Sequence, residues 1–411
     1  MEKAILVGIR LPGAKGRDIE TSLDELARLA ETAGAHCEEI IIQNRSRIDS
    51  AFAVGKGKAD ELRELCAAKN IQMVIFDDDL KPVQQQNLEE VIGVKIIDRS
   101  RLILDIFASH ARTREGILQV EYAQLAYFLP RLSKQGVMLD SQTGGIGTRG
   151  PGESKLEVDS RHIRDRMVML NRQIEVVRKQ RAVVRAKRIE SGMPTVAIIG
   201  YTNAGKSTLL NRLCACDAAY ADDKLFATLD PTTRKVPLAD GRTVLFTDTV
   251  GFINKLPHAL IAAFRATLEE VTAAHCLLHV VDIAHPDQVR QTQAVYAVLK
   301  ELNATHIPII TVYNKADLLT EQRRRILSEQ GNILISARSG DNLSALLTMI
   351  VSCVTPQLFP HHLLIPYTHN KHLTAIRRLS VVKKVTYQQN GISLDLESSR
   401  EDWNKIQTIL Q

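Results

Sequence analysis

Short apolar runs alternate with amphipathic stretches over the first 99 residues of the chain. The apolar runs are typical of strands, and the stretches between them carry the 3.6-residue spacing of helices. We expect strands at residues 5–9, 39–42, 73–76 and 95–97, and helices at residues 22–33, 58–68 and 83–92. Strands that alternate with helices predict a small parallel sheet.

Residues 100–192 lose the strand pattern and predict two long helices. The first covers residues 101–129 and is limited by Pro130, because proline disrupts a helix interior. The second follows a glycine-rich stretch at residues 143–153 and runs to about residue 191. Its apolar seam, with steps of three and four residues, is interrupted by Ser160 and Arg181 and consists of Leu156, Ile163, Met167, Leu170, Ile174, Val177 and Val184. The pattern predicts an antiparallel helical hairpin, and dimerisation through the seam is the alternative.

The remaining chain predicts two further parts. Residues 193–355 form a second α/β series, and residues 356–411 form a small α+β tail with a hairpin turn at Asn390-Gly391 and a helix at residues 398–410. The fold class is therefore α/β. The expected domains are an N-terminal α/β domain (1–99), a helical hairpin arm with a glycine-rich tip (100–192), a second α/β domain (193–355) and a small C-terminal domain (356–411).

Composition excludes several classes of protein. The chain has 411 residues, of which 45% are hydrophobic and 24% charged, with a net charge of +6, which is ordinary for a globular protein that buries a core. Its six cysteines are scattered, so we expect reduced thiols rather than a disulfide framework. No segment has the roughly 20 apolar residues needed to span a bilayer. We expect a cytoplasmic protein, with peripheral membrane association left open.

The strongest chemical signal is the run GYTNAGKS at residues 200–207. It matches G-x-x-x-x-G-K-[ST], and a β-branched strand precedes it while a helix follows. The glycines let the backbone N–H groups turn toward phosphates, Lys206 neutralises the β- and γ-phosphates, and Ser207 offers a hydroxyl to Mg²⁺. The predicted phosphate-binding residues are Gly200, Tyr201, Thr202, Asn203, Ala204, Gly205, Lys206 and Ser207. The second α/β domain is therefore predicted to be a P-loop domain with a mixed sheet flanked by helices.

Three further motifs follow at strand ends. Asp248 ends a β-branched run and suits a water-mediated contact to Mg²⁺, while Gly251 can direct its N–H to a γ-phosphate; the predicted segment is Asp248, Thr249, Val250 and Gly251. After residues 309–313 comes a guanine-recognition motif, in which Asp317 can accept hydrogen bonds from N1–H and the exocyclic amine of guanine. Adenine offers no such pair, and an unpaired polar group is costly. The predicted base-binding residues are Asn314, Lys315, Ala316 and Asp317, with Ser336, Ala337 and Arg338 after an expected strand at residues 332–335. Together these motifs predict a GTPase.

A loop between the first two motifs carries three candidate threonines, Thr228, Thr232 and Thr233, for closing over Mg²⁺ and the γ-phosphate. Spacing alone does not choose among them. The predicted nucleotide contacts in this loop are Phe226, Ala227, Thr228, Leu229 and Asp230.

At this point the sequence resembles the HflX family of translational GTPases. The resemblance rests on the four nucleotide motifs and on the runs FATLDP (226–231), DTVGF (248–252), GGIGTRGPGE (144–153), VGKGK (54–58) and LQVE (118–121), and covers about residues 1–355. It implies that Thr228 binds Mg²⁺ together with Ser207 and Asp248. It also implies GTP hydrolysis coupled to binding of the large (50S) ribosomal subunit and its rRNA. The implied process is ribosome splitting, ribosome rescue or ribosome assembly. The glycine-rich tip is implied to reach toward the peptidyl-transfer region of that subunit. The protein is expected to be a monomer on the ribosome.

Catalysis poses a separate question. Many small GTPases place a Gln after D-x-x-G to orient the attacking water, but this chain has Phe252 there. Asn203 stands at a position where similar GTPases bind K⁺. One hypothesis is therefore that Asn203 helps to bind K⁺, and its alternative is that Asn203 is a neutral loop residue. A second hypothesis is that the ribosome completes the catalytic site. We expect Lys206, Thr228, Gly251 and Asn203 to act in hydrolysis. A GTP-dependent binding module with negligible turnover, and a GTPase for another RNA task, remain alternatives.

Three motifs are weaker. Residues 145–150 read G-x-G-x-x-G, but their helical flanks argue against a dinucleotide fold and favour a hairpin tip where Arg149 meets RNA phosphate. His361, His362, His369 and His372 are expected to be solvated rather than metal-bound. Gly55-Lys56-Gly57-Lys58 is either an anion site or a lysine turn.

The net positive charge of the chain is concentrated in one helix. Residues 161–190 hold ten Arg and Lys against three acidic residues, so this stretch carries +7 while the other 381 residues sum to −1. A basic helix beside a glycine-rich tip predicts an RNA-binding arm, and a solvated helix face is the alternative.

Overall fold

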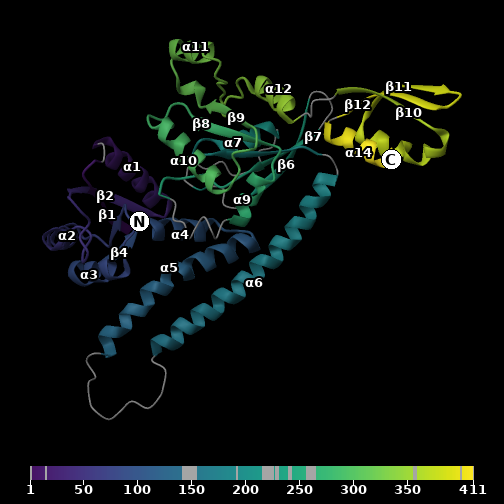
Figure 1. The fold of residues 1–411 in the computed structure, drawn as a ribbon. Helices are drawn as coiled ribbons and strands as arrows, with labels where there is room; N and C mark the ends of the chain where they lie inside the picture. Colours follow the sequence, from purple (N-terminus) through teal and green to yellow (C-terminus); the bar gives the residue numbers. More distant parts are fainter. Residues whose placement is uncertain are drawn as a thin grey trace. The chain divides into compact units, whose positions relative to one another are not determined.

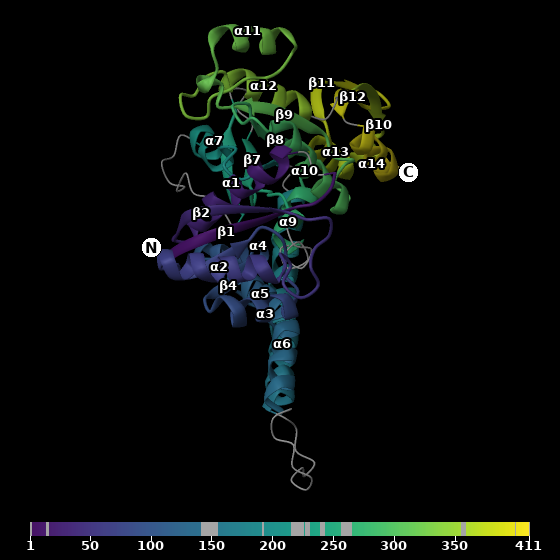
Figure 2. The same ribbon diagram turned by 90° about the vertical axis from the view of Figure 1, so that its left-hand side faces the viewer.

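A computed structural model describes residues 2–13, 16–140, 155–190, 193–214, 226, 231–238, 243–255, 265–354, 359–398 and 400–410. By its internal contacts the chain divides into two units, Met1–Leu347 and Thr348–Gln411. Figures 1 and 2 show their elements from two directions.

The N-terminal domain contains a four-stranded parallel sheet in the order β2-β1-β3-β4, as the βα alternation predicts. Its strands are β1 (Glu2–Arg10), β2 (Ala35–Asn44), β3 (Met73–Phe76) and β4 (Lys95–Asp98), and its helices are α1 (Gly16–Thr32), α2 (Lys56–Lys69) and α3 (Pro82–Ile92). Ala4 and Leu6 of β1 lie in one core with α1, whereas Ile5 and Val7 lie in another with α2 and α3. Burial on both faces explains why this strand is continuously apolar.

The expectation of one helix limited by Pro130 is wrong. The chain instead forms α4 (Arg99–His110) and α5 (Arg114–Asp140), and Pro130 lies inside α5. The break has a local cause, since the Thr113 hydroxyl accepts a hydrogen bond from the Gly116 N–H at 3.1 Å and caps the second helix. Tertiary contacts hold the helix beyond Pro130, because the Arg131 guanidinium donates to Leu80 O at 2.9 Å and to Asp98 Oδ2 at 3.0 Å.

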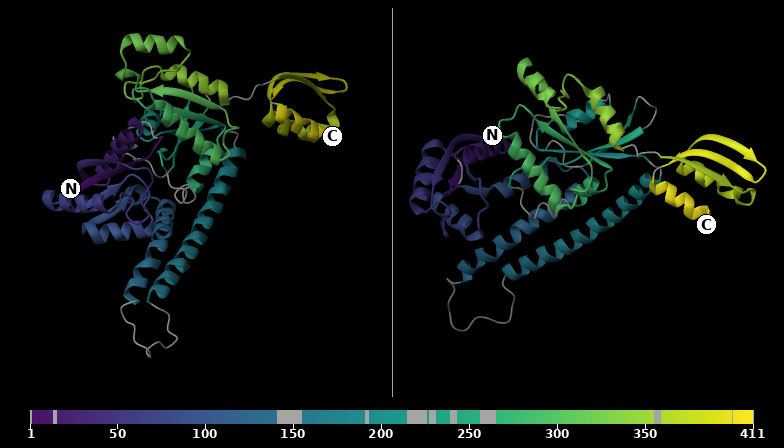
Figure 3. Two further views of the ribbon diagram at one scale, coloured as in Figure 1. Left: turned by 60° about the vertical axis from the view of Figure 1, so that its left-hand side comes forward. Right: turned by 45° about the horizontal axis from the view of Figure 1, so that its top comes forward.

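The predicted antiparallel hairpin is formed by α5 and α6 (Lys155–Glu190), which lie side by side in Figures 1 and 3. Leu170 of the seam is fully buried. Arg181, which interrupts the seam, pairs with the buried Glu115 of α5 at 2.7 Å. Packing against α5 thus uses the face that could otherwise have served a dimer. The glycine-rich tip at residues 143–153, Arg149 included, lies outside the described residues.

A five-stranded mixed sheet follows in the order β6-β7-β5-β8-β9, with only β6 antiparallel to its neighbour. The strands are β5 (Thr195–Gly200), β6 (Thr232–Pro237), β7 (Thr243–Asp248), β8 (Cys276–Asp282) and β9 (Ile309–Asn314). The helices are α7 (Lys206–Leu213), α9 (Arg265–Thr272), α10 (Gln288–Glu301), η1 (Ala316–Leu318), α11 (Glu321–Glu329) and α12 (Leu343–Val354). The strand expected at residues 332–335 is reduced to a single bridge between Leu334 and Tyr313. The P-loop, Asp248 and Asn314 lie at or just after the carboxyl ends of the parallel strands β5, β7 and β9, where ligands bind in such sheets.

The C-terminal unit contains an antiparallel sheet in the order β10-β12-β11. Its elements are β10 (Phe359–Ile365), η2 (Tyr367–His372), α13 (Leu373–Leu379), β11 (Val381–Gln388), β12 (Gly391–Ser398) and α14 (Arg400–Leu410). The hairpin and the last helix are as predicted, while β10 and α13 were not predicted. His361 stacks on Trp403 with ring centroids 3.8 Å apart, and His362 pairs with Asp395 at 2.7 Å.

Candidate GTP-binding site

Two glycines of the P-loop sit where no side chain fits. A Cβ on Gly200 would collide with the carbonyl oxygen of Val280, and one on Gly205 would collide with the side-chain amide of Asn314. Gly205 also has a φ of 92°, which disfavours any residue with a Cβ. The neighbouring Asn203 has a φ of 58° and an exposed side chain. The loop can therefore bring its backbone close to a phosphate chain.

Lys206 is held at the start of α7, where only 6% of it is exposed. Its ammonium donates to the carbonyl oxygen of Tyr201 at 2.8 Å. Burial lowers the pKa of Lys206 to about 8, and the negative charge of Asp248 offsets part of that shift. An anionic phosphate at this position would stabilise the charged form of the lysine.

The two predicted Mg²⁺ contacts described by the structure lie together. The Ser207 hydroxyl donates to Asp248 Oδ2 at 2.6 Å. A hydroxyl and a carboxylate are oxygen ligands of the kind that Mg²⁺ prefers, usually with several waters retained. The donor set therefore fits this ion.

The segment after Asp248 is tied to the P-loop by its backbone. The Phe252 N–H donates to Gly200 O at 3.1 Å, and the Thr202 N–H donates to Phe252 O at 2.8 Å. The Phe252 side chain is 2% exposed and packs in a core with Ile199 and Leu268. It is therefore a packing residue and cannot orient a water molecule.

Asn314 braces two nucleotide-binding loops at once. Its Nδ2 donates to Ala204 O in the P-loop at 2.8 Å, and its Oδ1 accepts from Ala337 N–H at 2.9 Å. Lys315 has a φ of 62° and pairs with Asp282 at 2.8 Å. The Asp317 side chain is exposed, so it is free to meet a base edge.

Only part of the threonine loop is described. Phe226 is buried at 2% exposure against Phe107 of α4, with ring centroids 4.6 Å apart. Thr232 and Thr233 are strand residues of β6, and Thr233 Oγ1 lies 2.9 Å from Thr247 Oγ1. The predicted contacts Ala227, Thr228, Leu229 and Asp230 lie outside the described residues.

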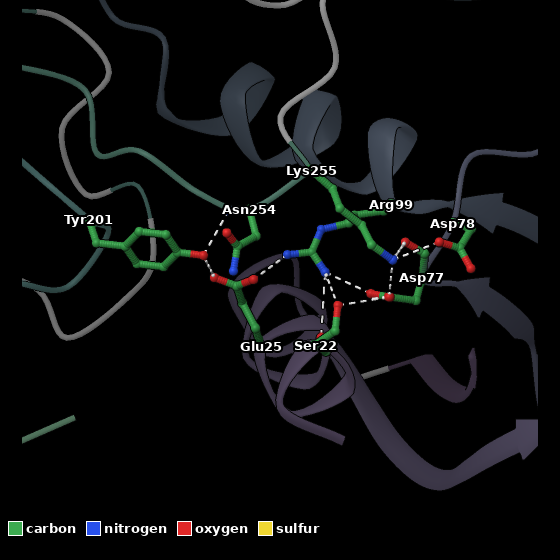
Figure 4. A network of polar contacts seen from close by, with 8 residues as sticks. All are labelled: Ser22, Glu25, Asp77, Asp78, Arg99, Tyr201, Asn254 and Lys255. Atoms are coloured by element: carbon green, nitrogen blue, oxygen red, sulfur yellow. Dashed lines mark hydrogen bonds and ion pairs between the residues drawn. The ribbon is translucent and has the colours of Figure 1, made fainter. Parts of the chain in front are cut away.

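Contacts between distant parts of the chain at this site have no recognisable signal in the sequence. Tyr201, predicted only as a phosphate-loop residue, directs its hydroxyl to Glu25 of α1 (Figure 4). A polar cavity of about 200 Å³ lies beside it, lined by Thr202, Asn203 and Lys315 among others. These contacts join elements about 180 residues apart in the chain, which no local pattern reveals.

The basic face of α6 is partly neutralised within the chain. Arg166 pairs with Glu121, Arg178 with Glu269, and Arg181 with Glu115. Arg164, Arg172 and Lys179 are exposed. Arg166 and Arg181 thus link α6 to α5 and Arg178 links it to α9, while Arg164, Arg172 and Lys179 add exposed positive charge to the helix.

Three negative findings apply to the described part of the chain. No group of three or more His, Cys, Asp or Glu residues there is arranged to hold a metal ion, and five free cysteines form no disulfide. None of the helices within the described ranges is both long and apolar enough to cross a membrane.

Comparison with known proteins gives consistent matches along the chain. Three family models match: "GTP-binding GTPase N-terminal" at residues 20–108, "GTP-binding GTPase Middle Region" at 110–188 and "50S ribosome-binding GTPase" at 195–315. A protein named GTPase HflX from Caldanaerobacter subterraneus subsp. tengcongensis is 45% identical over 100% of this chain and 94% of its own length. The GTPase HflX of Escherichia coli is 41% identical over 98% and 95%. A GTP-binding protein of Sulfolobus solfataricus, solved with GDP, is 23% identical over 86% of this chain and 99% of its own, with a TM-score of 0.46.

Proposed function

Because the chain belongs to the HflX family of GTPases, we propose that its GTP-bound form binds the large ribosomal subunit. GTP hydrolysis would then be coupled to ribosome splitting, rescue or assembly. The match of residues 195–315 to a model described as a 50S ribosome-binding GTPase supports the partner. The observation that carries the proposal is the exposed basic face of α6, formed by Arg164, Arg172 and Lys179. Such a face suits a phosphate backbone.

The proposed nucleotide contacts follow from the geometry of the site and, for Thr228, which lies outside the described residues, from the family. Lys206 and the P-loop N–H groups would hold the phosphates, and the Gly251 N–H would meet the γ-phosphate. Asp317 would accept from guanine while Asn314 keeps the base loop beside the P-loop. Ser207, Thr228 and, through water, Asp248 would hold Mg²⁺, which supplies charge neutralisation between the β- and γ-phosphates.

The attacking water needs an orienting group other than Phe252, whose ring lies in the core. Asn203 has an exposed side chain beside the polar cavity, and its amide oxygen can bind K⁺ there. The cation would supply the positive charge that an arginine finger gives in other GTPases. Comparing GTPase rates in K⁺ and Na⁺ buffers tests this role, and equal rates would remove it. Turnover with and without large subunits tests whether the ribosome completes the site.

The role of the arm is tested by charge removal. Changing Arg164, Arg172 and Lys179 to Gln is expected to weaken ribosome binding and to lower the slope of log K against log salt by about 2 to 3, while GTP affinity stays. A matched control changes the exposed Lys300, Arg323 and Arg325 to Gln. Equal ribosome affinities for the two triple variants would refute an RNA-binding arm.

A further inference from the structure

The base-recognition loop is held at both ends of one residue, Ala316. The Ala316 N–H donates to the carbonyl oxygen of Ile335 at 3.0 Å, and the Ala316 carbonyl oxygen accepts from the Leu319 N–H at 3.1 Å. That carbonyl oxygen also accepts a hydrogen bond from the Arg324 guanidinium, whose Nη2 lies 2.7 Å away. Arg324 lies outside every nucleotide motif, on helix α11 (Figure 1), and ties this helix to the loop.

The carbonyl group of Ala316 matters for recognition because it belongs to the peptide bond that joins Ala316 to Asp317. A peptide unit is planar, so the direction of this carbonyl sets the position of the N and Cα atoms of Asp317. The Asp317 side chain is exposed, and its carboxylate forms no hydrogen bond or ion pair with another described residue. Its placement therefore depends on the backbone that Arg324 holds.

The backbone before Asp317 needs such support. Lys315 has a φ of 62° and a ψ of 31°, a left-handed conformation that is unfavourable for a residue with a Cβ. The Lys315 ammonium pairs with Asp282 at 2.8 Å, and Arg324 holds the peptide unit one residue further along the chain. Two charged side chains thus keep the loop in a conformation that the chain by itself disfavours.

Packing does not explain the arginine at position 324. None of the nine residues of α11, all of which the structure describes, is buried. The Arg324 Nε is shielded from solvent and has no hydrogen-bond partner among the described residues, and a buried donor without a partner is destabilising. What the arginine provides is therefore the charged hydrogen bond from its Nη2 to the base-recognition loop.

We propose that Arg324 is a positioning residue for guanine recognition, because its hydrogen bond to Ala316 O orients the Asp317 carboxylate toward the base. This role rests on the proposed contact of Asp317 with guanine and extends it to a residue on α11. Guanine offers two donors, N1–H and the exocyclic amine, and one carboxylate oxygen must face each of them. A carboxylate on a loosened backbone can still turn to meet one donor, but it meets both only when its backbone is fixed.

The test compares GDP with inosine diphosphate, whose base keeps N1–H and lacks the exocyclic amine. Calorimetric titration of the full-length protein with each nucleotide and Mg²⁺ gives both affinities. The wild type is expected to prefer GDP by about tenfold or more, because a hydrogen bond to a charged group contributes that much. Arg324→Met is expected to bind GDP about tenfold more weakly and to keep a preference of only about threefold or less.

Two further measurements separate this role from a general loss of structure. Arg325→Met is the matched control on the same helix, since the Arg325 side chain is 76% exposed and pairs with Glu321 at 3.5 Å. It should keep both affinities within about twofold of the wild type. The midpoint of urea unfolding of Arg324→Met should stay at or above that of the wild type, because the unpartnered Nε donor is removed and Ala316 O keeps its bond from the Leu319 N–H.

Asp317→Ala distinguishes a failure of this role from a failure of the proposed base contact. The variant should lose the preference for GDP, and adding Arg324→Met to it should change GDP affinity by less than about twofold, because no carboxylate remains to be oriented. If Asp317→Ala kept the preference, the contact of Asp317 with guanine would be refuted together with the role of Arg324. If Asp317→Ala lost the preference while Arg324→Met kept it in full, only the role of Arg324 would be overturned.

Hydrogen exchange of the protein without nucleotide gives a second readout. The N–H groups of Ala316 and Leu319 both donate within this loop. In Arg324→Met they should exchange faster than in Arg325→Met, because the peptide unit after Ala316 has lost one of its anchors. Equal exchange in the two variants would contradict the hold of Arg324 on the loop.

Discussion

Asn314→Ala is expected to weaken GTP binding by at least about 30-fold. Asn314 is 2% exposed and makes two buried hydrogen bonds, one to Ala204 O at 2.8 Å and one from Ala337 N–H at 2.9 Å. Alanine leaves both backbone groups without these partners, at about 1–3 kcal/mol each. The lower sum of about 2 kcal/mol favours separated loops, and GTP binding must supply this free energy to bring the loops back together, which corresponds to about 30-fold in affinity. Part of the effect comes from separation of the base loop from the P-loop.

Titration of a fluorescent GTP analogue with Mg²⁺ measures this loss. Asn332→Ala is the control, because that amide makes a single bond to Leu327 O at 3.0 Å away from the P-loop. Its affinity should stay within about twofold of the wild type. If Asn314→Ala bound GTP within threefold of the wild type while folding normally, the two-loop brace would be refuted.

Two predictions concern buried charge. Arg99→Leu should lower the free energy of unfolding in urea by about 3–5 kcal/mol, because it removes one cation that pairs with the fully buried Asp77. Arg166→Leu should lower it by at most about 1 kcal/mol, because the pair between Arg166 and Glu121 is roughly half exposed. Equal losses of stability in the two variants would contradict this expectation. Burial, reinforced by the charge of Lys206, lowers the pKa of His279 to about 4. As the pH falls, the unfolded chain binds the proton on this histidine before the folded chain does, so stability falls as the pH drops from about 6.5 to 4. Between pH 7 and pH 5 the free energy of unfolding of His279→Gln should therefore fall by about 2 kcal/mol less than that of the wild type. Equal losses would show that His279 is not the titrating group.

The sequence predicted the elements whose signals are local. Residues 195–213 read as strand, glycine loop and helix because each part carries its own pattern, and the structure has β5, the P-loop and α7 there. The break between α4 and α5 was missed because the helical pattern of residues 101–129 was taken to continue past the Thr113 cap. Strand β10 was missed because its alternation of exposed and half-buried residues, with two adjacent histidines, is a weak strand pattern.

The residues of the candidate site likewise divide into those that the sequence predicted and those that it did not. Gly205, Lys206 and Asp248 were predictable because their spacing reflects a ligand's requirements. The ion pair between Lys255 and Asp77 was not predictable, because both are ordinary charged residues until the fold joins positions 178 residues apart. Their burial and pairing arise from domain packing, which has no period in the sequence.

The central claim is that the GTP-bound protein binds the large ribosomal subunit. Sedimentation of the protein with separated large and small subunits, in the presence of a non-hydrolysable GTP analogue or GDP, tests it directly. We expect the protein to sediment with the large subunit in the presence of the analogue and far less with GDP. Sedimentation with the small subunit alone, or with neither subunit, would contradict it.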